Sequence, residues 1–132
     1  QERVDRLGLL ALLDTLRYVQ MGGRISKIQY LLGSMLDVKP LLGIDHGEIK
    51  PIDRTRTRSK AIAGMVRRLD EAGPLEYLAV VHGSAPEDAD RLAEMVSSSR
   101  PGIDIQRGEI GAVLGTHTGP RALGLLYLRE RQ

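Results

Sequence analysis

The alternation of strand-like and helix-like stretches limits the folds open to this chain more than any other feature of its sequence. Short apolar runs, typical of strands, alternate with stretches whose apolar residues recur every three or four positions, as in helices. One connection, Asp45-His46-Gly47, is short enough for a hairpin in which Gly47 supplies a positive φ. A chain that combines helical crossovers with a hairpin forms a mixed sheet. We therefore predict the α/β (α+β) class, with a mixed, largely antiparallel sheet of about five strands flanked by helices.

The boundaries of the predicted elements follow from the same pattern. Strands are expected at Val38 to Ile44, Glu48 to Thr55, Glu76 to Val81, Ile103 to Arg107 and Ala122 to Leu128. Helices are expected after the capping boxes that begin at Ser26 and Ser84, and along the apolar stripe from Ala61 to Leu69. The run from Leu9 to Leu13 suits either a buried strand or a helix. Pro40 and Pro51 each remove a backbone donor, which favours edge strands or interrupted ones.

Composition makes the core of this single domain aliphatic. The chain of 132 residues has four Tyr and no Phe, Trp or Cys. The shortage of aromatic rings argues against binding of single-stranded nucleic acid by base stacking. The absence of Cys excludes disulfides, thiolate catalysis and Cys-ligated metals, and is compatible with a reducing, cytoplasmic location. No apolar run approaches about 18 residues, so no membrane span is predicted.

Two glycine-containing segments are candidates for ligand binding. In Gly22-Gly23-Arg24-Ile25-Ser26, two glycines allow close approach of a ligand, and Arg24 with the following helix N-terminus suits a carboxylate or phosphate. In Gly115-Thr116-His117-Thr118-Gly119-Pro120, the turn fixes the direction of the His117 ring between two hydroxyls. The simpler interpretations are a turn with a solvent-facing Arg24 and a tight loop with a surface His117.

A third candidate is His82, which follows a predicted buried strand. Ligands of open α/β sheets tend to lie at the carboxyl ends of strands. Ser84 is already expected to cap the next helix, and no nucleophile-elbow motif is present. An enzyme that uses His82 or His117 as a general base therefore lacks a visible nucleophile. The three histidines show no zinc-site spacing, and no glycine-rich nucleotide motif occurs, so neither a metal nor a cofactor is expected.

The positive charge of the chain is concentrated in one stretch. The formal net charge is only +2, but Lys50 to Arg68 contains seven basic residues and one acidic residue. Arg54, Arg56 and Arg58 are spaced two apart, which would place them on one face of an extended strand. Such a face suits an acidic protein partner or a phosphate-bearing ligand, and an ordinary solvated edge is the simpler alternative.

Five segments, in this order along the chain, resemble those of the DegV family of bacterial fatty-acid-binding proteins. They are Leu16-Arg17-Tyr18-Val19 with Gly22-Gly23-Arg24-Ile25-Ser26, Val38-Lys39-Pro40-Leu41-Leu42, Arg56-Thr57-Arg58, Ala79-Val80-Val81-His82-Gly83, and Gly115-Thr116-His117-Thr118-Gly119-Pro120. The resemblance covers nearly the whole chain. The segments that contain Arg24 and His117 are specific in combination.

The resemblance implies a fold and a function. Residues 1–132 would form the C-terminal lipid-binding domain of a DegV-like two-domain protein, with the N-terminal domain missing here. The run from Leu9 to Asp14 would then be a strand. Such proteins bind a long-chain fatty acid without catalysis and present it to a separate fatty acid kinase, which makes the acyl phosphate used in phospholipid synthesis.

The resemblance also implies roles for individual residues. Arg24 and His117 would orient the acyl carboxylate, with Ser26, Thr116, Thr118 and Arg121 as further candidate contacts. Arg121 stands where the family usually has Gly, so it either adds a contact to a carboxylate or phosphate or changes the shape of the loop. The apolar helix face that would line the acyl tail, with core packing as the alternative, consists of Ile28, Leu31, Leu32 and Met35. A competing hypothesis is a protein-docking or regulatory module that uses the Lys50 to Arg68 stretch, through Arg54, Arg56 and Arg58.

Overall fold

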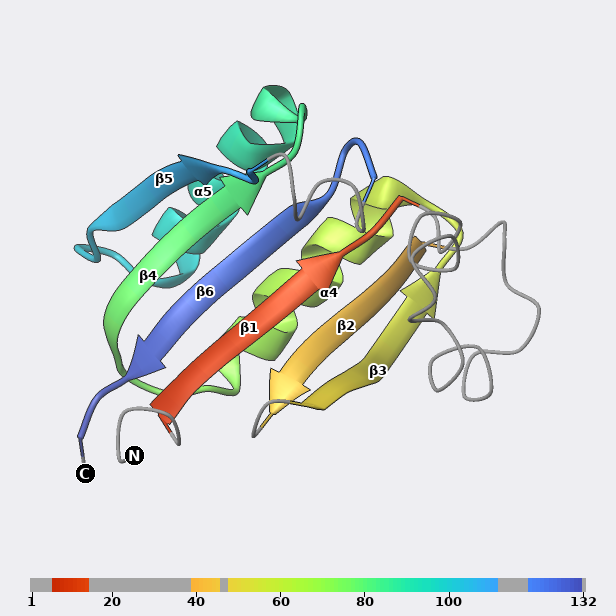
Figure 1. The fold of residues 1–132 in the computed structure, drawn as a ribbon. Helices are drawn as coiled ribbons and strands as arrows, with labels where there is room; N and C mark the ends of the chain where they lie inside the picture. The colour runs from red at the N-terminus through yellow and green to blue at the C-terminus, as the bar shows by residue number, and fades with distance from the viewer. Residues whose placement is uncertain (1–5, 15–38, 46–47, 112–118, 132) are drawn as a thin grey trace.

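The computed structural model describes residues 6–14, 39–45, 48–111 and 119–131, and the structural statements below concern these residues. They form a six-stranded sheet with two helices on one of its faces (Figure 1). The strands are β1 (Leu7–Leu12), β2 (Lys39–Asp45), β3 (Glu48–Thr55), β4 (Leu75–His82), β5 (Ile105–Glu109) and β6 (Leu123–Arg129). Their order in the sheet is β3-β2-β1-β6-β4-β5.

The prediction of a mixed, largely antiparallel sheet is confirmed, with six strands instead of about five. Only the neighbours β4 and β5 run parallel, and the other four neighbouring pairs are antiparallel. The additional strand is β1, which lies between β2 and β6. The helical alternative for the run that begins at Leu9 is therefore wrong, because this segment pairs on both edges. Strand β5 begins two residues later than expected, at Ile105.

The two prolines affect their strands differently. Pro51 lies in β3, which is at the edge of the sheet, as expected for a residue without an N–H group. Pro40 lies near the start of β2, an interior strand, and the β2–β3 register shifts between Leu41 and Leu42. The register pairs Asp45 with Glu48, whereas the predicted turn residues His46 and Gly47 lie outside the described ranges.

Helix α4 (Arg58–Asp70) begins where its local sequence directs it. The hydroxyl of its N-cap residue Thr57 accepts a hydrogen bond from the Lys60 N–H at 3.3 Å. Four residues of its predicted apolar stripe, Ala61, Ile62, Met65 and Leu69, are buried, and the fifth, Val66, is half-buried.

Helix α5 (Pro86–Ser99) begins one residue later than the Ser84 capping box predicted, so that prediction is wrong. Proline is favoured at the first helical position, and Pro86 makes Ala85 the N-cap. Ser84 instead adopts a left-handed backbone with φ 52°, and no side chain of the N-cap residue bonds the helix. The N–H of the N-cap residue Ala85 donates to Nδ1 of His82 at 3.0 Å.

The main core lies between the sheet and the two helices, which both cover the same sheet face (Figure 1). Every second residue of β1, Leu10 and Leu12, contributes to this core. Other contributors are Leu78, Val80, Leu92, Val96 and Leu125. Within the described ranges, no helix is long and apolar enough to span a lipid bilayer.

Candidate functional site

Charged side chains from several elements meet at one end of the sheet. The carboxyl ends of β1, β3, β4 and β5 and the amino ends of β2 and β6 share this end, because the latter two strands run in the opposite direction. Helices α4 and α5 both begin there (Figure 1). We call the group the edge cluster, and its members are Asp14, Lys39, Arg58, Asp88 and Arg121.

Arg58 is the most buried member of the edge cluster, with a side chain 9% exposed. Its Nε lies 2.5 Å from Asp88 Oδ2, and its Nη1 lies 3.3 Å from Asp14 Oδ1. Its Nη2 donates to the backbone carbonyl of Arg121. As the first residue of α4, Arg58 places a cation at the positive end of a helix dipole, and the two carboxylates offset that unfavourable position.

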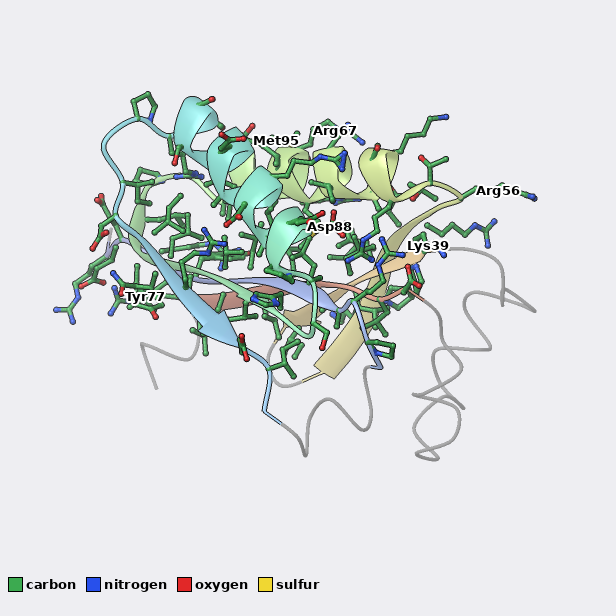
Figure 2. The ribbon with its side chains drawn as sticks, turned by 90° about the horizontal axis from the view of Figure 1, so that it is seen from above. Lys39, Arg56, Arg67, Tyr77, Asp88 and Met95 are labelled. Atoms are coloured by element: carbon green, nitrogen blue, oxygen red, sulfur yellow. The ribbon has the colours of Figure 1, made fainter. Side chains whose placement is uncertain are left out.

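Arg121 and Lys39 complete the edge cluster. The two terminal nitrogens of Arg121 each lie 3.6 Å from a carboxylate oxygen, Nη1 from Asp14 and Nη2 from Asp88. Lys39 Nζ lies 3.5 Å from Asp14 Oδ1 and donates to the Asp14 carbonyl at 3.1 Å. Figure 2 shows Asp88 on the helix side of the sheet and Lys39 at the start of β2.

The backbone at Arg121 has a conformation that is unusual for a residue with a side chain. Its φ is 66°, in the left-handed region that favours glycine. Arg121 therefore has a backbone conformation suited to glycine, and its side chain forms ion pairs with Asp14 and Asp88.

The arginines of the edge cluster change the acidity of Asp88. Burial raises the pKa of this carboxyl, but the hydrogen bond and charge of Arg58, with the charges of Arg121 and Arg91, outweigh burial and hold the pKa below its ordinary value. Asp88 also lies in the first turn of α5, where a negative charge is favourable.

The sheet face opposite the helices is also apolar. Side chains alternate along β1, so Leu9 and Ala11 point away from the helix-side core. A Cβ on Gly124 would lie 2.9 Å from Val81 and 3.9 Å from Leu9, which places these two side chains on the same face. We call this surface the second face, and the pairing assigns to it Leu7, Leu9, Ala11, Leu42, Ile44, Tyr77, Ala79, Val81, Leu126 and Leu128.

No described helix covers the second face (Figure 1). Away from the edge cluster it ends in the three large apolar residues with the greatest exposure among the described ones, Leu7 at 48%, Tyr77 at 42% and Ile44 at 38%. An apolar surface that leads from a charged cluster suits a ligand with an apolar tail and a polar head.

His82 has a structural role at the start of α5. Its side chain is buried, and Nδ1 accepts the Ala85 N–H, so the neutral ring carries its proton on Nε2. This hydrogen bond occupies one of the two nitrogens that a general base would use.

The structure separates the three arginines predicted to share one face. Strand β3 ends at Thr55, and Thr57 caps the helix that begins at Arg58, so Arg58 turns into the edge cluster. The prediction of one extended strand face is therefore wrong, because Arg56 lies beyond the end of β3 and Arg58 lies in α4. Arg54 and Arg56 are exposed, and Arg56 points away from the protein (Figure 2).

The remaining predicted site residues lie outside the described ranges. They are Arg24, Ser26, Ile28, Leu31, Leu32, Met35, Thr116, His117 and Thr118. The segments that contain them join the described chain at Asp14, Lys39, Gly111 and Gly119. Asp14 and Lys39 belong to the edge cluster, and Gly119 is two residues before Arg121.

A hollow of about 900 Å³ between α5 and β5 contains none of the predicted site residues. Its lining includes Met95 together with Asp90 and Arg107, which form an ion pair at 2.5 Å. The hollow is open and partly polar, so the second face is the better candidate for an apolar ligand.

Sequence reasoning did not find Asp14, Lys39 or Asp88. A helix-start signal was present, because Thr57 precedes the apolar stripe of α4 and is a favoured N-cap residue. This signal predicts that Arg58 lies in a helix and therefore not on an extended face with Arg54 and Arg56. The contacts among the five charged residues depend on the order of the strands in the sheet. The spacing of these residues in the sequence does not reveal that order.

Comparison with known proteins agrees with the motifs. The family model described as "Uncharacterised protein, DegV family" matches residues 1–130. A DegV domain-containing protein of Streptomyces coelicolor is 46% identical over 117 residues, which cover 86% of this chain and 41% of that protein. The crystal structure of DegV, a fatty acid binding protein from Bacillus subtilis, aligns with a TM-score of 0.81 and 36% identity over 98% of this chain and 47% of its own.

A stearic acid-binding protein from Eubacterium ventriosum aligns with a TM-score of 0.80 and 26% identity, over 96% of this chain and 45% of its own. This chain thus spans less than half the length of each of these three relatives. Because the family model matches almost every residue, and the fold is shared, the chain belongs to the DegV family.

Proposed function

We propose that this protein binds a long-chain fatty acid, with the tail along the second face and the carboxylate near the edge cluster. The observation that carries this proposal is an apolar sheet face that no described helix covers and that leads from a charged end of the sheet. The descriptions of the related Bacillus subtilis and Eubacterium ventriosum structures as fatty-acid-binding proteins support the same ligand class.

In this proposal Arg24 and His117 bind the carboxylate. A guanidinium group matches a carboxylate in geometry and charge, and a histidine N–H adds a second donor. Ser26, Thr116, Thr118 and Arg121 are proposed as further polar contacts. The apolar side chains proposed to cover the tail are Ile28, Leu31, Leu32 and Met35.

The tail provides most of the affinity. Each buried methylene contributes about 0.8 kcal/mol, so a long acyl chain contributes roughly 10 kcal/mol before ordering costs. Polar contacts to the carboxylate add about 1–3 kcal/mol and fix the direction in which the ligand lies.

We further propose that the bound fatty acid is presented to a separate, kinase-type protein in the cytoplasm and that this protein is not itself the enzyme. The relatives are more than twice as long as the matched region, which supports a site completed by a second domain.

Mass spectrometry of lipid extracted from the purified full-length protein tests fatty-acid binding. We expect a co-purified acyl chain, and titration of the delipidated protein with palmitic acid should show saturable binding. Arg24→Ala and His117→Ala should each weaken binding about tenfold, whereas Arg67→Ala, at an exposed position on α4, should not. Absence of both a bound acyl chain and palmitic acid uptake would overturn the proposal.

A protein-docking function is the second candidate, and the exposure of Arg54 and Arg56 beside the edge cluster favours it. A partner that docks there would lie close to the proposed carboxylate. Arg56→Glu should weaken binding of an acidic partner protein and leave palmitic acid binding unchanged, while Arg67→Glu should affect neither. If Arg56→Glu leaves partner binding intact, this face is ordinary solvated surface.

A further inference from the structure

Strand β5 is one of the two edge strands of the sheet, and its outer side pairs with no strand in the described ranges (Figure 1). The opposite edge strand, β3, contains Pro51, a residue that discourages the addition of another strand. The residues of β5, Ile105-Gln106-Arg107-Gly108-Glu109, include no proline. The two edges therefore differ, and β5 is the one that presents an unbroken backbone for pairing.

The backbone groups of β5 that point outward follow from its pairing with β4. The Ile110 N–H donates to the His82 carbonyl at 2.7 Å, so the backbone of residue 110 faces β4. Backbone groups of successive residues in a strand point to opposite sides, so the second and fourth residues before it also face β4. The residues whose N–H and C=O groups point away from β4 are therefore Ile105, Arg107 and Glu109.

Two copies of β5 can pair antiparallel around a two-fold axis at Gly108. Arg107 of one copy then lies opposite Glu109 of the second copy, and the outward backbone groups of these two residues meet. The axis produces this pair twice, and Gly108 lies opposite its own copy, where the absence of a side chain permits close approach. Opposite charges directly across an antiparallel pair are favourable. An axis at Arg107 would instead place two arginines opposite one another, which is unfavourable.

The side chains of this pair are accessible and lie on one face of the sheet. Arg107 Nη2 lies 2.5 Å from Oδ1 of Asp90 in α5, so Arg107 is on the helix side, and its side chain is 43% exposed. Glu109, two residues further along the strand, is on the same side and is exposed. No ion pair joins Glu109 to another residue in the part of the chain that the structure describes. Arg107 of a second copy would supply the missing cation.

We propose that β5 is the contact surface between two copies of this protein, in a dimer whose two-fold axis passes through Gly108. The occupant is a second copy because the edge is complementary to itself, both in its outward backbone groups and in its charges. The dimer continues the sheet across the axis, with both α5 helices on the same face, because the axis is perpendicular to the sheet. The inference is independent of fatty-acid binding, since no residue of β5 belongs to the second face or to the edge cluster.

Sedimentation equilibrium of the full-length protein tests the dimer, at concentrations from about 1 μM to about 1 mM, which cover the Kd expected of a small interface. Arg107→Glu and Glu109→Arg each place two like-charged pairs across the axis, so each should raise the dimer Kd about tenfold. The double variant, which exchanges the two charges, should regain most of that affinity. The matched control is Arg67→Glu, the same charge change at an exposed position on α4, which should leave the Kd unchanged.

Hydrogen exchange of the wild-type protein adds a measurement that needs no variant. The amides of Arg107 and Glu109 should exchange more slowly as the protein concentration rises, because dimerisation gives both an acceptor. A wild-type protein that stays monomeric at about 1 mM would overturn the proposal. Protection of these amides at every concentration would also overturn it, because another part of the same chain would then cover the edge. A double variant that dimerises no better than the single variants would overturn the pairing centred on Gly108.

Discussion

Arg58, the first residue of α4, and Asp88, in the first turn of α5, are joined by an ion pair of 2.5 Å between Nε and Oδ2. The pair couples the starts of the only two helices in the described ranges. Its side chains are 9% and 19% exposed, so the pair is largely removed from water. Loss of one partner leaves the other charge poorly solvated, which is the costly way to break such a pair.

Arg58→Ala should therefore destabilise the protein by about 3 kcal/mol. Urea unfolding followed by circular dichroism measures this change. Arg107→Ala is the matched control, because its pair with Asp90 is 43% and 71% exposed and should contribute less than about 1 kcal/mol. Equal effects of the two substitutions would show that burial of the Arg58 pair has no energetic consequence.

The stability of the fold should decrease in acid because of Asp88. Its pKa in the folded protein lies below the ordinary value of 3.8, so its stabilising effect is fully present above that value. The effect is lost as the pH falls through the lower folded-state pKa, since the unfolded chain binds the proton first. Urea midpoints from about pH 6 to about pH 3 should fall in the wild type and fall less steeply in Asp88→Asn. Parallel profiles for the two proteins would contradict this assignment.

Gly8→Ala and Gly64→Ala should change stability in opposite directions. A Cβ on Gly8 would overlap the ring of Tyr127, which is 6% exposed and packed in the core, so this substitution should destabilise by about 2 kcal/mol. Gly64 lies within α4, and a Cβ there would meet only Arg67 Nη2, at 3.6 Å. Gly64→Ala should stabilise by about 1 kcal/mol, through the higher helix propensity of alanine. Thermal unfolding of both variants measures the two signs, and a stabilised Gly8→Ala would show that Tyr127 moves aside freely.

Arg121→Gly and Arg121→Ala should differ in stability because of the backbone at this position. Both remove the ion pairs with Asp14 and Asp88, but only alanine keeps a Cβ at φ 66°. The left-handed conformation costs a residue with a Cβ about 1 kcal/mol, so the glycine variant should be the more stable by that amount. Equal stability in urea unfolding would show that the turn relaxes when the arginine is removed.

Much of the fold was predictable because it depends on local signals. The apolar stripe of α4 and the apolar run of β4 each specify one element, and both were found close to their observed bounds. The start of α5 was misplaced because two local signals compete there, a serine capping box and Pro86 at the first helical position. The run at Leu9 stayed ambiguous because a short central strand has no period that distinguishes it from a helix.

The sequence by itself determined the aliphatic core, the mixed sheet and membership of the DegV family, because composition, periodicity and motifs are properties of neighbouring residues. Only the tertiary structure decided that Asp14, Lys39, Arg58, Asp88 and Arg121 meet, since these residues are far apart in the chain and are brought together by the strand order. It also decided that Arg58 turns inward while Arg56 stays exposed, because the strand ends at Thr55 and the helix begins at Arg58. A two-residue spacing places side chains on one face only while the backbone remains extended.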